Sequence, residues 1–349
     1  MIISNRYNFI YIHIPKTGGS SINHSLKNYH DEKAGSLYYK KKYSHQTVLD
    51  LERIFGKNYD QYYSFAFVRN PWDRLVSWYM YLREHMADRL RFYFENMFPD
   101  FKAYLKFLEK YTQFFDANEY EFYDAPYNIP FPQSQFISGG DGNIHVDYIG
   151  RFEKLSDDFL SVCNTLGIQS HLRHDNRSKH RDYRAYYDSK SIDIVKDLFR
   201  KEIDILGFEF DAGLKQPIKS DRWHQLENGL ESFNQHKWER AIDIYDALLS
   251  EKTRIDIERQ LKLAESYEKV GKKEMALELL LKIVEVAPDN LTAWGKIMDQ
   301  ARRSQSNQLL VRSITHLKGI FYFQKLVHSR IWRWISTKFT GLFAKSENG

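Results

Sequence analysis

The stretch Phe9–Leu26, FIYIHIPKTGGSSINHSL, decides how the N-terminal part of this chain should fold. Its first residues are β-branched and aromatic, which predicts a short buried strand over 8–14 that ends at a Pro- and Gly-containing turn. A helix should follow, with Ser20 or Ser21 as its N-cap. The turn has the composition of a phosphate-binding loop, but the usual order, G-x-x-x-x-G-K-[ST], places the lysine last. Here Lys16 comes first, so the sequence raises the question of which anion such a loop serves.

A second strand–turn–helix unit comes some fifty residues later. The apolar run 63–68 ends at RNP, and Pro71 stands where a proline is tolerated, at the start of a helix predicted over 72–85. A third predicted strand, 145–150, leads into a helix over 155–166. Because polar residues gather at the carboxyl ends of the strands, the pattern predicts a parallel α/β sheet with ligands bound at that edge.

Composition sets limits on the class of protein. With 349 residues, 42% hydrophobic and 28% charged, the chain is typical of an ordinary globular protein of about two domains. The net charge of +5 is mild and indicates a local anion site rather than a nucleic-acid partner. The single cysteine, Cys163, excludes an internal disulfide and a cysteine-based zinc cluster. Neither a signal peptide nor an apolar run of about 20 residues is found, so a cytoplasmic location is expected.

The remaining segments suggest a division into domains. Residues 86–136 are a Phe- and Tyr-rich insertion with amphipathic helix character, and 172–187 are polar and basic, as in a loop. A helix predicted over 189–205 closes a first domain, 1–210. Residues 211–222 contain glycine and proline and are predicted to be a linker.

The hydrophobic period changes in residues 223–318, which are predicted to be helical repeats. The unit 257–290 resembles a tetratricopeptide repeat, in that a small residue, tyrosine, glycine, alanine, a large apolar residue and proline follow in that family's order. These residues are Ala264, Tyr267, Gly271, Ala276, Leu280 and Pro288. The flanking units match less well, and a generic helical hairpin bundle is the alternative. A repeat stack would present a surface for a protein partner or an acceptor chain.

The tail, 319–349, contains KLVHSRIWRWISTKF at 325–339. As a helix this stretch is amphipathic, basic and rich in tryptophan, as in segments that lie in a membrane interface. The alternative is that its apolar side covers the end of the repeats.

Two motifs together resemble a known family. PKTGGSS at 15–21 and FVRNPWDRLVSWY at 67–79 each begin at the end of a predicted strand, in the family's order. On these residues the segment 8–210 resembles the sulfotransferases, in particular the bacterial and Golgi carbohydrate sulfotransferases related to the uronyl 2-O-sulfotransferases. The resemblance implies a P-loop-like three-layer sandwich with a central parallel sheet. It also implies transfer of a sulfuryl group from 3′-phosphoadenosine 5′-phosphosulfate to a hydroxyl, expected to be that of a saccharide.

This donor carries two separated anions, so its site needs two anion clamps. The first is the loop after the first strand, where glycines let amides approach an anion and hydroxyls add donors. Its expected members are Lys16, Thr17, Gly18, Gly19, Ser20 and Ser21. Lys16 can reach the oxygen that bridges phosphate and sulfate, which gains charge as the bond breaks. No metal is expected, because sulfate carries less charge than a terminal phosphate.

The second clamp is Arg69 with Ser77, eight residues further on. The resemblance implies that this pair binds the 3′-phosphate, for which the planar fork of an arginine is suited. The alternative for Arg69 is a surface ion pair with Asp73.

Transfer to a hydroxyl also needs a base. The position of His45 matches the histidine that serves as base in the uronyl 2-O-sulfotransferases, and His13 and His24 are the rivals. The polar loop 174–187 resembles the family's segment that folds over the nucleotide, with Ser178 and Tyr183 as the preferred contacts. The family's Arg-Lys-Gly signature is absent from that loop, which puts the individual contacts in doubt.

Two other functions compete with this one. A P-loop-type kinase would need a Gly-Lys-[Ser/Thr] loop and a carboxylate for magnesium at a neighbouring strand end, and the sequence supplies neither. A non-catalytic nucleotide-binding scaffold carrying tetratricopeptide-like repeats would not need Lys16, Arg69, Ser77 and His45 together. No motif names the acceptor.

Overall fold

The computed structural model describes residues 1–30, 45–85, 88–111, 131–172, 181–211, 213, 215–250, 257–306, 309 and 313. The chain divides into two compact units. The first comprises Met1–Glu231 and Leu248–Glu258, and the second comprises Ser232–Ala247 and Arg259–Gly349. The chain passes from one unit to the other three times, within α11 (Asp221–Asn234), α12 (Trp238–Ser250) and α13 (Ile257–Lys269).

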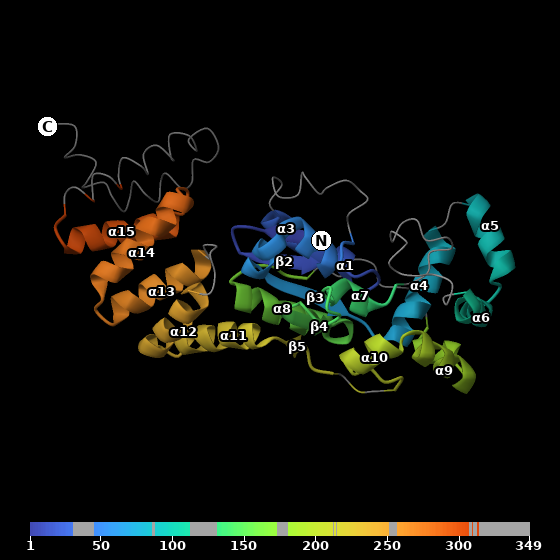
Figure 1. The fold of residues 1–349 in the computed structure, drawn as a ribbon. Helices are drawn as coiled ribbons and strands as arrows, with labels where there is room; N and C mark the ends of the chain where they lie inside the picture. Colours follow the sequence, from blue (N-terminus) through green and yellow to red (C-terminus); the bar gives the residue numbers. More distant parts are fainter. Residues whose placement is uncertain are drawn as a thin grey trace. The chain divides into compact units, whose positions relative to one another are not determined.

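The first unit is built on a mixed five-stranded sheet (Figure 1). Its strands follow the order of the chain: β1 (Ile2–Ser4), β2 (Phe9–Ile12), β3 (Tyr63–Val68), β4 (Tyr148–Arg151) and β5 (Ile218–Lys219). The three central strands are parallel, and β1 and β5 pair antiparallel at the two edges. The strand predicted over 63–68 is confirmed, whereas β2 and β4 are shorter than predicted. The predicted parallel sheet is therefore present as the three central strands of a mixed sheet.

Helices cover both faces of this sheet, which is why its central strands are apolar without alternation. On one face, Ile10 and Ile12 belong to a core cluster that also contains Leu51 of α3 and residues of α4. On the other face the rings of Tyr11 and Phe65 stack at 5.2 Å, and α8 packs against β4. The arrangement is an α/β fold with three layers.

The helices of the first unit connect these strands. They are α1 (Gly19–Leu26), α3 (Val48–Phe55), α4 (Pro71–His85), α5 (Asp88–Met97), α6 (Phe101–Tyr111), α7 (Gln133–Ile137), α8 (Leu155–Leu166), α9 (Ser189–Leu198) and α10 (Arg200–Leu206), with 3₁₀ turns η1 (Lys27–Tyr29), η3 (Gly56–Gln61), η5 (Phe152–Lys154) and η6 (Tyr183–Tyr186). α8 has the bounds that the sequence predicts. The single helix predicted over 189–205 is instead two, because the chain turns at Phe199 and buries its ring in the core.

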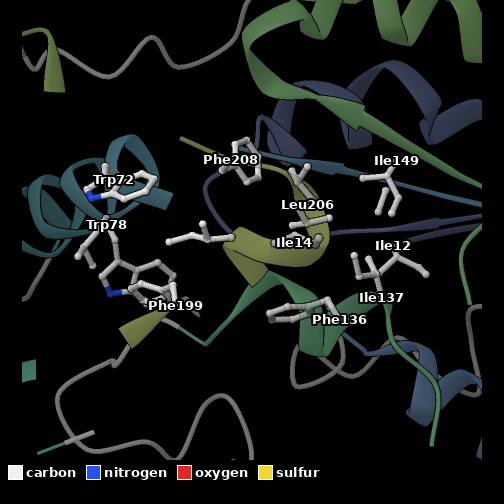
Figure 2. Packing of buried hydrophobic residues seen from close by; sticks show 14 of the residues in the cluster. Ile12, Ile14, Trp72, Trp78, Phe136, Ile137, Ile149, Phe199, Leu206 and Phe208 are labelled. Carbon is white, nitrogen blue, oxygen red and sulfur yellow. The ribbon is translucent and has the colours of Figure 1, made fainter. Parts of the chain in front are cut away.

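The main core lies on the face of the sheet that carries α3, α4 and α7 (Figure 2). Trp72 and Trp78 of α4 lie in this cluster together with Phe136 of α7 and Leu206 of α10, and all four are at most 6% exposed. Burial of one such side chain stabilises a fold by about 1.5–3 kcal/mol. The predicted insertion therefore contributes to the core through α7, and also through α5 and α6, whose Phe94 and Tyr104 belong to the same cluster.

The segment 211–222 is not the free linker that its composition predicts. Residues Ile218–Lys219 form β5 beside β4, and Arg222 makes an ion pair of 2.7 Å with the buried Asp147. Trp223, at the start of α11, is fully buried and its ring packs against Tyr148 at 4.9 Å. Glycine and proline in a sequence reveal turns but not edge-strand pairing. A chain cut near Asp211 would therefore lose part of the sheet.

The described part of the second unit consists of helical hairpins. Its helices include α13 (Ile257–Lys269), α14 (Lys273–Val286) and α15 (Leu291–Arg303), preceded by α12 (Trp238–Ser250). The apolar residues of the predicted repeat are buried, among them Ala264, Ala276 and Leu280. Met275, which the sequence pattern places with them, is 47% exposed.

The helices α11, α13 and α15 end in the same turn at nearly constant intervals. His236, Gly271 and Gln305 each have a positive φ, at 59°, 82° and 54°. In each case the next amide bonds the carbonyl five residues before it, which is the Schellman motif. This turn recurs after 35 and then 34 residues, although only the middle one contains glycine. The structure thus contains a third turn of the repeat that the sequence pattern barely indicates.

The proposed amphipathic helix at 325–339, with the rest of the tail from 319, lies outside the described residues. Among the helices that are described, none is both long and apolar enough to cross a bilayer.

Candidate active site

Three adjacent parallel strands bring their carboxyl ends together at one edge of the sheet. Lys16 follows β2, Arg69 follows β3, and Phe152 follows β4. The Nη1 group of Arg69 donates to the main-chain carbonyl of Lys16 at 3.3 Å, so the two predicted clamps are in direct contact. Ligands of open α/β sheets bind at this edge.

The turn between β2 and α1 has an unusual backbone. Lys16 and Gly18 both lie in the left-handed region, with φ of 68° and 82°. The hydroxyl of Thr17 donates to the carbonyl of Ile14 at 2.8 Å, which closes the turn but uses the hydrogen that an anion was expected to receive. The expected serine cap is wrong: Gly18 is the N-cap residue and has no side chain with which to cap the helix. The first-turn amides of α1 are therefore oriented towards the site without a capping side chain.

The two glycines of this turn have different tasks. Gly18 is required by its positive φ and because a Cβ there would come within 2.5 Å of Leu155. Gly19 has no positive φ, but a Cβ there would lie 1.8 Å from Nε2 of His13. Gly19 thus makes room for a histidine ring.

The ammonium group of Lys16 lies over the ring of Tyr81, 4.3 Å from its centroid. The pKa of Lys16 is lowered to about 8, chiefly by burial and also by the positive charge of Arg69, while Glu84 acts in the opposite direction. An anion bound beside this lysine would favour its charged form.

The side chain of Arg69 is held from three sides. Its Nε donates to Asp73 at 2.8 Å, and its guanidinium lies 4.1 Å from the ring centroid of Phe152. The ion pair with Asp73 that was the alternative interpretation is present, but the arginine side chain is only 5% exposed, so it is not a surface pair. Within the described part of the chain, Nη2 has no hydrogen-bond partner and remains for a ligand.

The main chain of Arg69 is held by a side chain that sequence analysis did not single out. The amide group of Gln133 accepts from the N–H of Arg69 and donates to its carbonyl, both at 2.8 Å. Gln133 is in turn bonded to the fully buried carboxylate of Glu202, whose pKa is raised by burial. These bonds span 64 and 69 residues of sequence, and no local pattern signals them.

Helix α4 is capped by the protein itself. The side-chain oxygen of Asn70 accepts from the amides of Trp72, at 3.0 Å, and Asp73, at 3.4 Å. The amide of Asn70 donates to Glu153 at 2.7 Å. The Asn-Pro pair is a recognisable helix start, with an N-cap residue followed by proline at the first helical position.

Arg74 is a second residue that sequence analysis missed. It is 2% exposed, and it donates to the carbonyls of Pro15, at 3.1 Å, and Phe131, at 2.9 Å. Burial lowers its pKa to about 10, while the charge of Glu202 opposes that shift. An arginine in a helix normally indicates a solvated face, so nothing in the sequence identifies this buried support of the loop.

His45 lies against the strand end of β2. Its Nδ1 is 2.9 Å from the carbonyl oxygen of His13, and the two rings are 4.3 Å apart. A carbonyl only accepts, so Nδ1 carries a proton, and in the neutral ring the lone pair is on Nε2. Burial lowers the pKa of His45 to about 4; the bond to His13 opposes the shift, and the N-terminal amine and Arg74 reinforce it.

The remaining predicted residues are distributed unevenly. Ser77 is buried on α4, two turns after the start of that helix. Tyr183 lies in η6, donates to the carbonyl of Phe210, and is close enough to Asp73 for its pKa to be raised by that charge, after burial. Ser178 lies outside the described residues. Among those described, no group of three His, Cys, Asp or Glu side chains could hold a metal ion.

A three-layer arrangement of helices around a mostly parallel sheet, with Lys16 and Arg69 at the carboxyl ends of adjacent strands, defines an α/β protein. Residues 1–209 match the family model described as "Sulfotransferase family", and the chain belongs to this family. An uncharacterized protein of Archaeoglobus fulgidus is 26% identical over 120 residues, which are 34% of this chain and 80% of that protein. No solved structure matches the chain.

Proposed function

We propose that this protein transfers a sulfuryl group from 3′-phosphoadenosine 5′-phosphosulfate to a hydroxyl group of a saccharide. The observation that carries the proposal is the contact between the two clamps, in which Arg69 reaches the main chain of Lys16 at 3.3 Å. Two cationic groups from neighbouring strand ends, one with amides and one with a guanidinium fork, suit a donor with two separated anions.

In this proposal the β2–α1 turn binds the 5′-phosphosulfate. The uncapped first turn of α1 offers amides, Ser20 and Ser21 add hydroxyls, and Lys16 carries the compensating charge. Arg69, Ser77, Ser178 and Tyr183 are assigned to the nucleotide and its 3′-phosphate. Gln133 and Phe152 keep the arginine in place before the donor arrives, which reduces the entropy that binding must overcome.

The chemistry is an in-line exchange of oxygens at sulfur. The bond from sulfur to the bridging oxygen breaks, and a bond from sulfur to the acceptor oxygen forms. Lys16 stabilises the negative charge that develops on the bridging oxygen. The hydroxyl proton passes to Nε2 of His45, which carries the lone pair because Nδ1 donates to His13. A base held in this tautomer supports an enzyme rather than a non-catalytic scaffold.

The test uses the nucleotide product. 3′-Phosphoadenosine 5′-phosphate should raise the melting temperature strongly, and ADP, which lacks the 3′-phosphate, much less. Arg69→Ala should abolish most of this difference, a loss of about 1.5–3 kcal/mol for a hydrogen bond to a charged group. Arg200→Ala is the matched control, because that arginine is 64% exposed on α10. Equal stabilisation by the two nucleotides would refute the assignment.

We further propose that the second unit is a tetratricopeptide-like module that recruits a protein partner or a polymeric acceptor. Support comes from the Schellman turn that recurs at His236, Gly271 and Gln305. A chain that ends at Glu258 keeps every residue of the first unit. It should bind the donor normally but discriminate less between long and short acceptors. Unchanged discrimination would contradict the recruiting role.

A further inference from the structure

A column of rings leads from the core of the sheet to His45. Tyr11 and His13 project from the same side of the chain leaving β2, with ring centroids 6.1 Å apart and nearly parallel planes. His45 continues the column at 4.3 Å from His13. Tyr11 is fully buried, so the first ring of this column is held in place by the core.

The ring of His13 is itself fixed on two sides. The side-chain amide of Asn23, on α1, lies 3.1 Å from Nδ1 of His13. The Asn23 oxygen lies 3.4 Å from the amine of Met1, and the side-chain nitrogen of Asn23, which can only donate, faces Nδ1 of His13. Gly19 lies against the opposite nitrogen, Nε2. The ring therefore cannot turn without displacing the loop.

These contacts give the two histidines opposite tautomers. Nδ1 of His13 accepts a hydrogen bond, so in the neutral ring the proton is on Nε2, whereas the proton of His45 is on Nδ1. His13 thus has no lone pair on the nitrogen that faces the loop, and of the two rings only that of His45 can accept a proton through Nε2. This excludes His13 as the base, so its contribution to the site must be a different one.

We propose that His13, oriented by Asn23, is a positioning residue for the base: its carbonyl selects the tautomer of His45 and its ring fixes the plane of that imidazole. The inference rests on the proposed function, because it assigns His13 a role through His45. Its consequence is that the loop and the base share one support, since the His13 ring touches both Gly19 and His45.

The first test is a set of double-mutant cycles in a labelled-sulfate transfer assay. His13→Ala should lower kcat by roughly 10- to 100-fold, as expected when a general base loses its alignment. In a His45→Ala background the same change should have almost no further effect, because its target is gone. His13→Phe fills the same space and is the second variant in case His13→Ala folds poorly. It should lower kcat by less, and this decrease should disappear in the His45→Ala background. Additive losses for both variants would overturn the proposal.

The second test is the pH profile. Among the described residues, the charged or titratable groups that face His45 include His13, the N-terminal amine and Arg74. Removing the His13 ring lets water reach His45, so the acid limb of kcat/KM should move upward towards the usual pKa of histidine, about 6.5. An acid limb that stays where it is in His13→Ala would contradict a contact between the two rings in solution.

Asn23→Leu addresses the orientation of His13. It should lower kcat several-fold in the wild-type background but leave kcat unchanged in the His45→Ala background. The affinity for 3′-phosphoadenosine 5′-phosphate should stay within about twofold of the wild-type value. Asn28→Leu is the control, because it makes the same exchange at an exposed position that follows α1 in the chain. A loss in Asn23→Leu that persists without His45 would assign Asn23 to folding alone.

The outcomes separate this inference from the proposed function. Absence of transfer by the wild-type protein with every acceptor, together with no binding of 3′-phosphoadenosine 5′-phosphate, would overturn both. Transfer that survives His45→Ala would place the base elsewhere and overturn the inference alone. A final check is Gly19→Ala, which should weaken nucleotide binding because its Cβ meets His13, and should be rescued by His13→Ala. Lack of rescue would contradict the shared support.

Discussion

The N-termini of α1 and α4 follow two neighbouring strands of the sheet, and they differ in whether the N-cap residue caps them with its side chain. α1 begins at Gly19 without a side-chain cap. α4 begins after Asn70, whose side chain accepts from two amides of the first turn, and the amide of Asn70 is bonded to Glu153. The first N-terminus thus has an N-cap residue without a side chain, whereas the second is filled by the side chain of Asn70. A filled N-terminus cannot also hold an anion through its amides, so the second turn must offer the side chain of Arg69 instead.

The largest expected effect comes from the turn before α1. Lys16→Ala should lower the single-turnover rate of transfer on the order of 100- to 1000-fold, as when one donor to a developing oxyanion is removed. Lys16→Arg keeps the charge and should lose less. Rapid-quench measurement with labelled donor gives both rates. A fall of less than tenfold in Lys16→Ala would mean that the bridging oxygen is stabilised by other groups.

The backbone of the turn before α1 can be tested through stability. Gly18→Ala should cost about 2–4 kcal/mol, because it adds left-handed strain to a clash with Leu155 at 2.5 Å. Gly207→Ala is the matched control, since Gly207 has φ of +66° but a Cβ there would meet nothing within 4 Å. It should cost only about 1–2 kcal/mol. Urea unfolding measures both, and equal losses would show that the packing against α8 is loose.

The filled turn should respond to loss of its cap. Asn70→Ala should reduce the free energy of unfolding by about 1 kcal/mol, a typical value for an N-cap. Ser20→Ala, at the uncapped start of α1, should change it by less than about 0.5 kcal/mol. If the serine change costs as much as the asparagine change, α1 is capped in solution and the contrast between the two turns does not hold.

The smallest expected effects concern pH. His45 must be neutral, so kcat/KM should fall as the pH drops through its burial-lowered pKa of about 4. Lys16 must be charged, so kcat/KM should fall as the pH rises through its burial-lowered pKa of about 8, by about twofold at that pH. Lys16→Arg should remove the alkaline limb. An alkaline limb that survives this change belongs to another group.

Much of the fold could be predicted from local patterns. The strand Tyr63–Val68 and the helix Leu155–Leu166 have the predicted bounds, because apolar runs and helix periodicity are local signals. The motifs around Lys16 and Arg69 also indicated the family to which the chain belongs. What the sequence could not indicate was that β5 pairs at the edge, because a two-residue strand has no pattern of its own.

The supports of the candidate site were beyond prediction for a different reason. Gln133, Glu202 and Arg74 act through bonds to groups that are 57 to 69 residues away in the chain. A glutamine at the start of a short helix and an arginine inside another have no signature that distinguishes them from surface residues. The role of Gly19 was also hidden, since a glycine beside a conspicuous anion loop suggests ligand approach rather than space for a histidine.

The amide of Gln133 bonds both main-chain groups of Arg69 and so joins the two ends of the intervening stretch of chain. Within that stretch, Phe98 and Tyr104 belong to the core cluster that also contains residues of α4, and the carbonyl of Phe131 accepts from Arg74. An exchange confined to residues 112–130 leaves these contacts in place. Replacing those residues with the equivalent stretch of another sulfotransferase should change which acceptors are used, while the hybrid keeps the donor affinity of its parent.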